Sequence, residues 1–208
     1  MNSAEKIRSE IRNLAQMAER LLFILAGCNG AGKTTATHTL LPDLLPCLEF
    51  VNADEIARGL SPFQPDEVAV QAGRIMLQRM EDLTVQAKTF AFETTLSGRT
   101  YLPKIKAAKK AGYTIVLIFL WLPDVDLAKS RVRQRVMEGG HGIPEQTIER
   151  RYYRGIRHLF NSYLPEVDTA YIVDSSAREF SLIARQTVNS RLFISDFEKF
   201  QTMKTLLS

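Results

Sequence analysis

The segment GCNGAGKT at residues 27–34 constrains the fold of this chain more than any other stretch. It satisfies the pattern G-x-x-x-x-G-K-[ST], in which small glycines let successive backbone N–H groups turn inward around phosphate oxygens. A continuous apolar run at 21–26 precedes the segment, and a helical pattern follows it. Strand, loop and helix in this order are the context that a phosphate-binding loop requires. The sequence therefore predicts a nucleotide site in a P-loop NTPase fold.

Each part of this loop has an expected role. Lys33 reaches the β- and γ-phosphates, the Thr34 hydroxyl binds Mg²⁺, and the following helix directs its positive end at the anion. The residues predicted to hold the nucleotide are Gly27, Asn29, Gly30, Ala31, Gly32, Lys33, Thr34 and Thr35.

The rest of the chain alternates short apolar runs with helical patterns. Strands are predicted at 21–26, 48–52, 89–93, 113–122 and 170–174, and helices at 3–20 and at about 33–44, 65–88, 101–111, 125–138, 145–163 and 178–190. This alternation predicts an α/β fold with a parallel sheet of about five strands and helices on both faces. The segment RLFIS at 191–195 fits an edge strand, but it also fits a chain end that frays.

Length and composition are consistent with a single cytoplasmic domain covering 1–208. We expect an N-terminal helix at 1–20, a core at 21–190 and a tail at 191–208. The net charge of +4 suits a nucleotide as well as a nucleic acid, so it does not by itself favour nucleic acid as a partner. Two cysteines, Cys28 and Cys47, make no disulfide framework, and no apolar stretch is long enough to span a membrane.

Polar side chains follow two of the predicted strands. Asn52 and Asp54 follow the second strand, and Glu93 closes the third. Ligands of open parallel sheets bind at these carboxyl ends, so we predict an acceptor site there that comprises Asn52, Glu93, Thr94, Thr95, Ser97 and Arg99. A carboxylate at the edge of an apolar strand costs free energy unless it is used, although Glu93 also fits a structural hydrogen-bond acceptor. Asp54 also fits an N-cap of the next helix.

Residues 125–163 have the composition of a helical lid. Six arginines, Arg131, Arg133, Arg135, Arg150, Arg151 and Arg154, flank the glycine-rich segment GGHGIP at 139–144. Small kinases use such lids to close arginines over a transferring phosphoryl group, whereas a solvated basic face or an ion-pair network explains part of the set. A base, acceptor contacts and a lid that excludes water together favour transfer to a hydroxyl over hydrolysis.

Four segments resemble the zeta toxins, a P-loop kinase family of bacterial toxin–antitoxin systems. They are GCNGAGKTT, VNADEIA, FAFETTLSGRTYLPKIKAAKKAGY and RVRQRVMEGGHGIPEQTIERRYYR, in this order, and they fall within residues 22–174. The resemblance implies a fold similar to nucleoside monophosphate kinases and phosphorylation, with ATP or GTP, of the 3′-hydroxyl on the amino sugar of UDP-N-acetylglucosamine. It also implies a small antitoxin protein that blocks the nucleotide pocket.

The resemblance assigns roles by position. Asp54 matches the catalytic base, Lys33 and Thr34 match the phosphate and magnesium ligands, and Glu93 matches the carboxylate of the sugar-nucleotide pocket. The first lid arginine is one of Arg131, Arg133 and Arg135, of which we name Arg131 and Arg135 as catalytic candidates.

One position departs from the family. His141 stands three residues before Pro144, where zeta toxins carry an arginine. Neutral histidine can donate one hydrogen bond but does not supply a permanent charge. We therefore expect His141 to contact substrate and a second lid cation to come from Arg150, Arg151 or Arg154.

Two other functions remain compatible with these residues. A kinase of the same architecture can act on another hydroxyl, such as that of a nucleoside, an antibiotic or a polynucleotide 5′ end. A nucleotide-binding protein without catalysis can instead regulate a partner.

Overall fold

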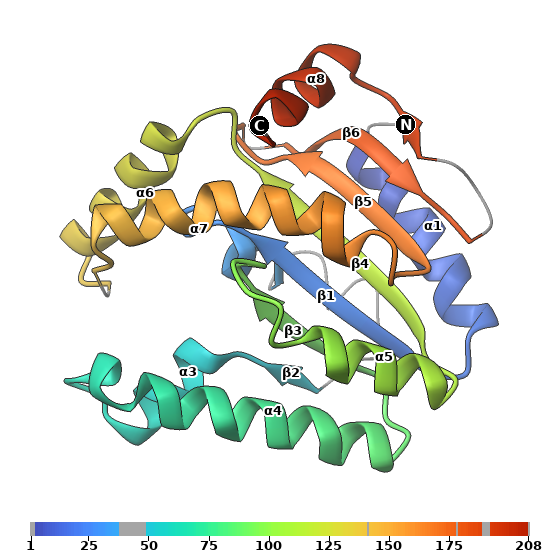
Figure 1. Ribbon diagram of the computed structural model, residues 1–208, viewed down its shortest axis with the longest axis horizontal. Coiled ribbons are helices and arrows are strands. Elements are labelled where there is room, and N and C mark those ends of the chain that lie inside the picture. The colour runs from blue at the N-terminus through green and yellow to red at the C-terminus, as the bar shows by residue number, and fades with distance from the viewer. Residues whose placement is uncertain (1–2, 38–48, 141, 178, 189–191, 208) are drawn as a thin grey trace.

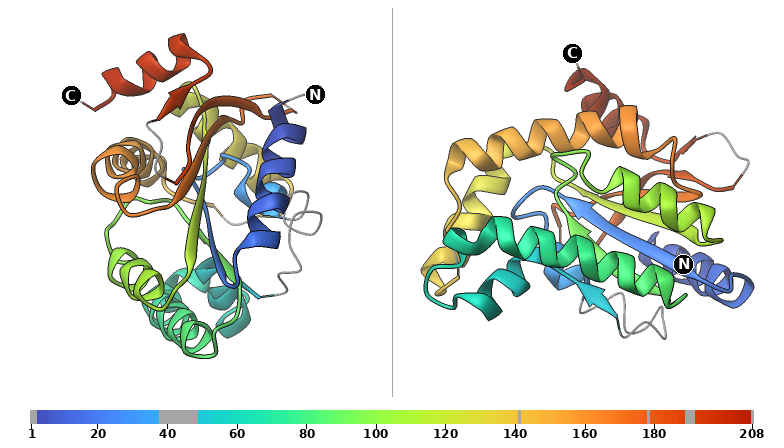
Figure 2. Two further views of the ribbon diagram at one scale, coloured as in Figure 1. Left: turned by 90° about the vertical axis from the view of Figure 1, so that its right-hand side faces the viewer. Right: turned by 60° about the horizontal axis from the view of Figure 1, so that its bottom comes forward.

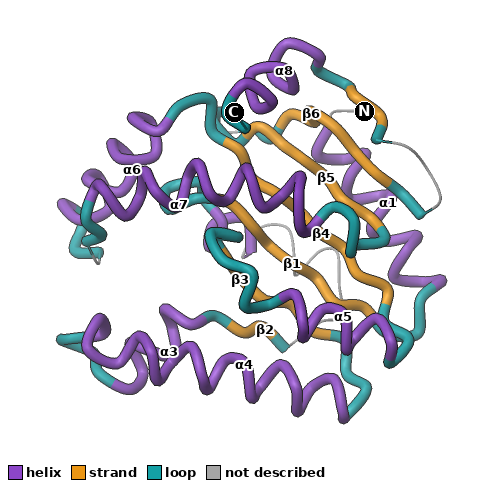
Figure 3. Tube along the Cα trace, in the orientation of Figure 1, coloured by secondary structure: helices purple, strands orange, loops and turns teal. Residues whose placement is uncertain are grey.

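A mixed β-sheet of seven strands organises the computed structural model, which describes residues 3–37, 49–140, 142–177, 179–188 and 192–207 (Figures 1 and 3). The strand order is β2-β3-β1-β4-β5-β6-β7. The strands are β1 (Leu21–Gly27), β2 (Phe50–Val51), β3 (Phe90–Thr94), β4 (Thr114–Trp121), β5 (Thr169–Asp174), β6 (Ser181–Gln186) and β7 (Phe193–Ile194). Strands β1 to β5 pair in parallel, whereas β6 and β7 pair antiparallel.

Helices cover the two faces of this sheet (Figure 2). Helix α1 (Ser3–Met17) lies on one face, and α5 (Leu102–Lys110) and α7 (Glu145–His158) lie on the other. The remaining elements are α3 (Ala53–Leu60), a 3₁₀ turn (Pro65–Val68), α4 (Ala69–Val85), α6 (Val125–Met137), a π-helical turn (Leu159–Tyr163) and α8 (Phe197–Thr205). Residues 33–37 are helical as well.

The two central strands are buried along almost their whole length. Every residue of β1 is buried, and in β4 only Thr114 is partly exposed. Strands covered on both faces read as continuous apolar runs, which is why the runs at 21–26 and 113–122 predict them correctly. The pairing of β1 with β3 sets Leu25 opposite Glu93, so the chain reaches the glycine loop beside that carboxylate.

The predicted parallel sheet of five strands is confirmed, and two antiparallel strands, β6 and β7, extend it beyond β5. The helix predicted at 178–190 is wrong, because 181–186 forms β6. Leu182, Ile183 and Ala184 are consecutive and buried, and β6 pairs antiparallel with β5 while α1 and α8 pack nearby. Pairing and burial from both sides outweigh helix propensity here. Residue 178 and residues 189–190 lie outside the described part.

The tail contains more structure than a frayed end. Phe193–Ile194 forms an edge strand, as one of the two interpretations of RLFIS predicts. Asp196 then caps α8 by accepting a hydrogen bond from the Lys199 N–H. Two other helices differ in extent. The one predicted at 65–88 begins as a 3₁₀ turn, and that predicted at 33–44 is seen at 33–37, since 38–44 lie outside the described residues.

None of the helices in the described part of the chain is long and apolar enough to cross a lipid bilayer.

Helix α7 packs closely on the loop that follows β3. A Cβ atom added at Gly155 would lie 2.7 Å from the Thr95 carbonyl oxygen, which no side chain tolerates without movement. Two hydrogen bonds hold the same loop: His158 Nδ1 is 2.8 Å from the Leu96 carbonyl oxygen, and the Tyr163 hydroxyl donates to that of Gly98 at 2.7 Å. The lid helix and the segment after β3 are therefore fixed relative to one another.

We expect Gly155→Ala to lower the free energy of unfolding by about 1–3 kcal/mol, because the added methyl group overpacks against backbone. Gly59→Ala is the matched control, since Gly59 is also helical and a Cβ there meets nothing within 4 Å. The control should gain up to about 1 kcal/mol from helix propensity. Chemical denaturation measures both, and equal stabilities of the two variants would contradict the close contact.

Candidate active site

The glycine loop joins the end of β1 to the helical residues 33–37. Gly27 and Gly30 have φ values of +146° and +81°. A Cβ at Gly27 would lie 2.5 Å from the Leu120 carbonyl oxygen, and one at Gly30 would lie 2.6 Å from that of Ala128. Both positions need glycine, because space and backbone conformation exclude a side chain. Residues 29–35 all line a cleft of about 790 Å³.

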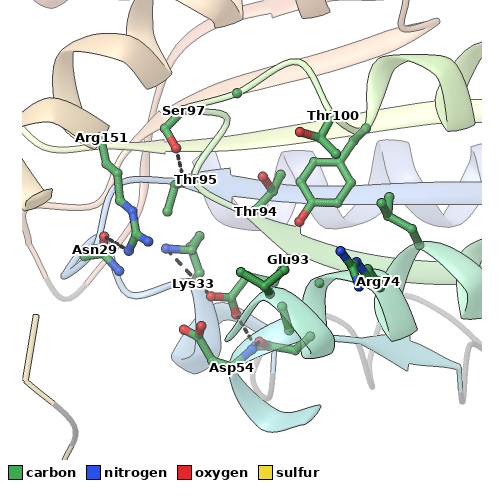
Figure 4. Close-up of a pocket in the computed structure, with 17 residues that line it drawn as sticks. Asn29, Lys33, Asp54, Arg74, Glu93, Thr94, Thr95, Ser97, Thr100 and Arg151 are labelled. Carbon is green, nitrogen blue, oxygen red and sulfur yellow. Dashed lines mark hydrogen bonds and ion pairs between the residues drawn. The ribbon is translucent and has the colours of Figure 1, made fainter. Parts of the chain in front are cut away.

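The Lys33 ammonium group lies at the centre of the site (Figure 4). Lys33 is buried, and its Nζ donates to the Cys28 carbonyl oxygen at 2.9 Å and lies 3.7 Å from Glu93 Oε1. Burial raises the pKa of the neighbouring Cys28 thiol to about 11. This thiol therefore stays protonated and is no nucleophile at neutral pH.

The Glu93 carboxylate connects the loop to both neighbouring strands. Its Oε2 accepts hydrogen bonds from the Thr34 hydroxyl at 3.4 Å and from Asn52 Nδ2 at 3.2 Å. Burial raises the pKa of Glu93 by more than the nearby Lys33 lowers it, and the negative charge of Asp54 raises it further. Glu93 is therefore a hydrogen-bond acceptor, as one interpretation of the sequence predicts, but its donors include Thr34 of the glycine loop.

Thr34 and Glu93 offer a pair of oxygen donors that suits magnesium. The described residues contain no cluster of three or more histidine, cysteine or acidic side chains that could hold a metal alone. Mg²⁺ usually takes only one or two protein oxygens, together with substrate phosphates and water. The oxygen donors of Thr34 and Glu93 match this coordination preference.

Asp54 is not the N-cap of α3, which was one of its two predicted roles. Asn52 caps α3 instead, because its Oδ1 accepts from the Asp54 backbone N–H at 2.8 Å. The Asp54 side chain is exposed and lines the cleft of the glycine loop. It also lines a second cavity, described next, so its carboxylate lies where the two meet.

The second cavity has a volume of about 440 Å³ and is lined by Glu93 and Thr94 at the carboxyl end of β3. Its polar lining includes Thr94, Thr95, Ser97, Thr100, Tyr101 and Arg74. The cavity and the loop cleft share Asn29, Lys33, Asn52, Asp54 and Glu93. We name it the acceptor cavity after the acceptor site that the sequence predicts here, and a molecule in it would face the glycine loop across these shared residues.

The lid arginines occupy different positions. The Arg131 guanidinium donates to the carbonyl oxygens of Ser175 at 2.9 Å and Ser176 at 2.6 Å, and it reaches that of Gly30 at 3.4 Å. It therefore fastens α6 to the loop. Arg135 lines the loop cleft and also a third cavity of about 380 Å³ beneath the lid. Arg133 of α6 instead forms an ion pair with Glu145 of α7.

Arg151 is the lid cation that reaches the phosphate loop. Its Nη1 donates to Asn29 Oδ1 at 3.1 Å, and it lines both the acceptor cavity and the cavity beneath the lid (Figure 4). Arg150 also lines the cavity beneath the lid. Arg154 is exposed and lines none of the three cavities, and His141 lies outside the described residues.

The structure brings most of the predicted site together but places Arg99 elsewhere. Arg99 is exposed and does not line the acceptor cavity, although its neighbours Gly98 and Thr100 do. Arg74, Thr100 and Tyr101 also line the cavity, although none of them belongs to a motif recognised in the sequence. Arg74 is contributed by the long helix α4, where only the fold reveals which side faces the site.

The raised pKa of Glu93 gives a pH-dependent prediction. A carboxyl group with a higher pKa in the fold stabilises it below the ordinary value of about 4.5, and this contribution is lost as the pH rises through the folded pKa. Glu93→Gln cannot ionise, so we expect it to be more stable than the wild type at pH 7. The difference should shrink as the pH falls towards 4.5.

Denaturant unfolding over this pH range measures the difference, with Glu19→Gln as a control because that carboxylate is exposed. A wild-type protein more stable than Glu93→Gln at pH 7 would show that attraction to Lys33 outweighs the penalty of burial.

Comparisons with solved structures agree with this architecture. A chain in the crystal structure of AvrRxo1-ORF1 and -ORF2 with ATP superposes with a TM-score of 0.73 at 17% identity, covering 99% of this chain and 71% of that one. The PezAT chromosomal toxin–antitoxin system of Streptococcus pneumoniae gives 0.61 at 15% identity, with 98% and 94% covered. A putative kinase from Chloroflexus aurantiacus gives 0.54 at 16% identity, with 66% and 80% covered. At these identities the likeness shows the fold, which is that of P-loop kinases.

Sequence comparison gives the family. An uncharacterised protein of Haemophilus influenzae is 29% identical over 141 residues, which cover 68% of this chain and 98% of that protein. Residues 22–154 match the AAA_33 family, described as an AAA domain, and this match takes in the glycine loop, both strand-end acids and most of the lid. The chain belongs to the AAA_33 family of AAA domains.

Proposed function

We propose that this chain is a kinase that transfers the terminal phosphoryl group of ATP or GTP to a hydroxyl group of a small molecule. The observation that carries the proposal is the junction of two cavities. A phosphate-loop cleft and a hydroxyl-lined acceptor cavity meet at Lys33, Asp54 and Glu93. An ATPase that uses water needs no such second cavity.

The residues of the loop cleft would hold the nucleotide. Backbone N–H groups of residues 29–34 and the Lys33 ammonium would bind its phosphates, and Thr34 with Glu93 would hold magnesium. A magnesium ion at this position would supply positive charge to the phosphate oxygens. Lys33 is already close to both the loop and Glu93, so little side-chain rearrangement is needed.

Asp54 would act as the general base. As the acceptor oxygen bonds to the terminal phosphorus, its proton passes to the Asp54 carboxylate, and the nucleoside diphosphate leaves with the bridging oxygen. Asp54 suits this role better than Glu93, because Glu93 is largely buried and its carboxylate is engaged by Thr34, Asn52 and Lys33. Exposure of Asp54 lets the proton return to solvent.

Arginines of the lid would stabilise the charge of the transferring group. Arg151 reaches the loop through Asn29, and Arg135 faces the same cleft from α6. Arg131 is better placed to position α6, because its guanidinium is occupied by backbone carbonyl groups. Among the lid arginines, we therefore assign Arg151 and Arg135 to the reaction.

UDP-N-acetylglucosamine is the acceptor that we propose. The motif resemblance to zeta toxins supports it, as does the fold shared with PezAT, a toxin–antitoxin system. Hydroxyl groups of Thr94, Thr95, Ser97 and Thr100 give the acceptor cavity partners for a polyhydroxylated ligand. On the same grounds, we propose that this chain is a cytoplasmic toxin whose partner is a small antitoxin protein.

The proposal predicts that the protein transfers phosphate from ATP to UDP-N-acetylglucosamine. Phosphorus NMR of ATP, magnesium and one acceptor at a time should show a new phosphomonoester with this compound. It should show none with uridine, an aminoglycoside or an oligonucleotide with a 5′-hydroxyl. Transfer to another member of this panel would support the kinase activity but identify a different acceptor. ATP binding without any transfer would favour a regulatory protein.

Asp54→Asn is expected to lower kcat by about 10²–10⁴-fold, because the proton acceptor is removed. The dissociation constant for magnesium-ATP should change by less than about twofold, since nucleotide ligands remain. Asp126→Asn is the control, because Asp126 is exposed and lines none of the three cavities. A fully active Asp54→Asn enzyme would remove Asp54 from the mechanism.

A further inference from the structure

We propose that Arg74 and Gly73 form a subsite for an anionic group of the acceptor, a phosphate or a carboxylate, with Arg74 as the specificity-determining residue. The inference rests on the proposed kinase function, but it does not depend on which acceptor is phosphorylated. It concerns the part of the acceptor that does not react.

Arg74 lies at the end of the acceptor cavity that is remote from the phosphate loop. In Figure 4, Arg151 and Asn29 lie on one side of Glu93, and Arg74 lies on the other. A hydroxyl at Asp54 would therefore place the remainder of the acceptor towards Arg74. The guanidinium group would meet this remainder and not the transferring phosphoryl group.

The side chain of Arg74 is exposed to solvent and lines the acceptor cavity. Within the described part of the chain, Arg74 forms no ion pair, although other cations nearby do: Arg79 pairs with Glu49 and Lys104 with Glu81, each at 2.6 Å. Glu93, an acid of the same cavity, is engaged by Lys33. A planar cation that is always charged favours carboxylate and phosphate groups, which it can bind with two parallel hydrogen bonds.

Gly73 provides room beside this cation. It lines the acceptor cavity, and a Cβ atom there would meet no atom within 4 Å. Glycine is unfavourable inside a helix, and Gly73 lies inside α4. Packing does not require it, because the space beyond its Cα is open. The open space belongs to the cavity, so a ligand group can approach the helix backbone at this point.

Tyr101 gives the subsite a rigid wall. Its ring packs against Phe92 with centroids 5.1 Å apart, and its hydroxyl contacts Met76 Sδ at 3.4 Å. Arg74 and Tyr101 line the same cavity from different elements. A ligand group held by Arg74 would thus lie against a fixed aromatic surface.

Calorimetric titration of matched ligands tests the subsite. The protein is first saturated with magnesium and adenylyl imidodiphosphate, so that the phosphate loop is occupied. The probes are N-acetylglucosamine against N-acetylglucosamine 1-phosphate, uridine against uridine monophosphate, and N-acetylglucosamine against N-acetylmuramic acid for the carboxylate. We expect the wild type to bind at least one charged probe about 10- to 100-fold more tightly than its neutral partner, as for a hydrogen bond to a charged group.

Three variants separate charge from space. Arg74→Gln should abolish the preference for the charged probe, and Arg74→Lys should keep part of it, since the charge remains but the planar fork is lost. Gly73→Leu should weaken binding of both members of a pair by filling the cavity. Gly59→Leu is its control, because Gly59 is helical, open and outside the three cavities.

Two results would overturn the inference: equal or absent binding of charged and neutral probes by the wild type, or a full preference retained by Arg74→Gln. Kinetics separate its failure from failure of the kinase proposal. With an active charged acceptor, Arg74→Gln should raise KM about tenfold or more and change kcat by less than about twofold. If Arg74→Gln transfers phosphate with an unchanged KM, the kinase proposal stands and the subsite is refuted. If Arg74→Gln loses the preference for charged probes but the wild type transfers phosphate to no acceptor, the subsite is supported and the kinase proposal fails.

Discussion

The contact between the Lys33 ammonium and the Glu93 carboxylate joins the two halves of the site. It exists because β1 and β3 are parallel neighbours with Leu25 opposite Glu93, so the loop that follows β1 returns across the end of β3. Lys33 is buried, and a buried charge is tolerated only with an opposite charge or with hydrogen bonds. The glycine loop and β3 are therefore linked by one pair of opposite charges.

Two carboxylates near this contact differ through their surroundings. Glu93 accepts from Thr34 and Asn52 and is largely buried, whereas Asp54 stands at the first turn of α3 with its side chain exposed. Burial and the charge of Asp54 both raise the pKa of Glu93. Environments that separate two acids in this way commonly give them separate tasks. Here the buried acid suits a metal and the exposed one suits a proton.

The sequence predicts those parts of this site that depend on short local patterns. The glycine loop, the buried strands and the acids at their ends follow from spacing and periodicity. The segment at 181–186 does not, because its pairing with β5 depends on residues far away in the chain. Arg74 has the same difficulty: a surface arginine in a long helix carries no signal until α4 is placed against the end of β3. Arg99 shows the converse, since proximity in sequence to Ser97 does not bring it into the cavity.

The lid is tied to the loop at two points, which limits how it can move. Arg131 binds carbonyl oxygens of Ser175 and Ser176 as well as reaching Gly30, and Arg151 binds the side chain of Asn29. Behind the first point, Asp174 forms an ion pair with Lys199 at 2.9 Å, so α8 supports the chain that Arg131 holds. A displacement of α6 or α7 would break bonds to residues of the phosphate loop itself. The position of the lid and the shape of the glycine loop are therefore coupled through Gly30 and Asn29. The arginines that couple them lie about a hundred residues further along the chain.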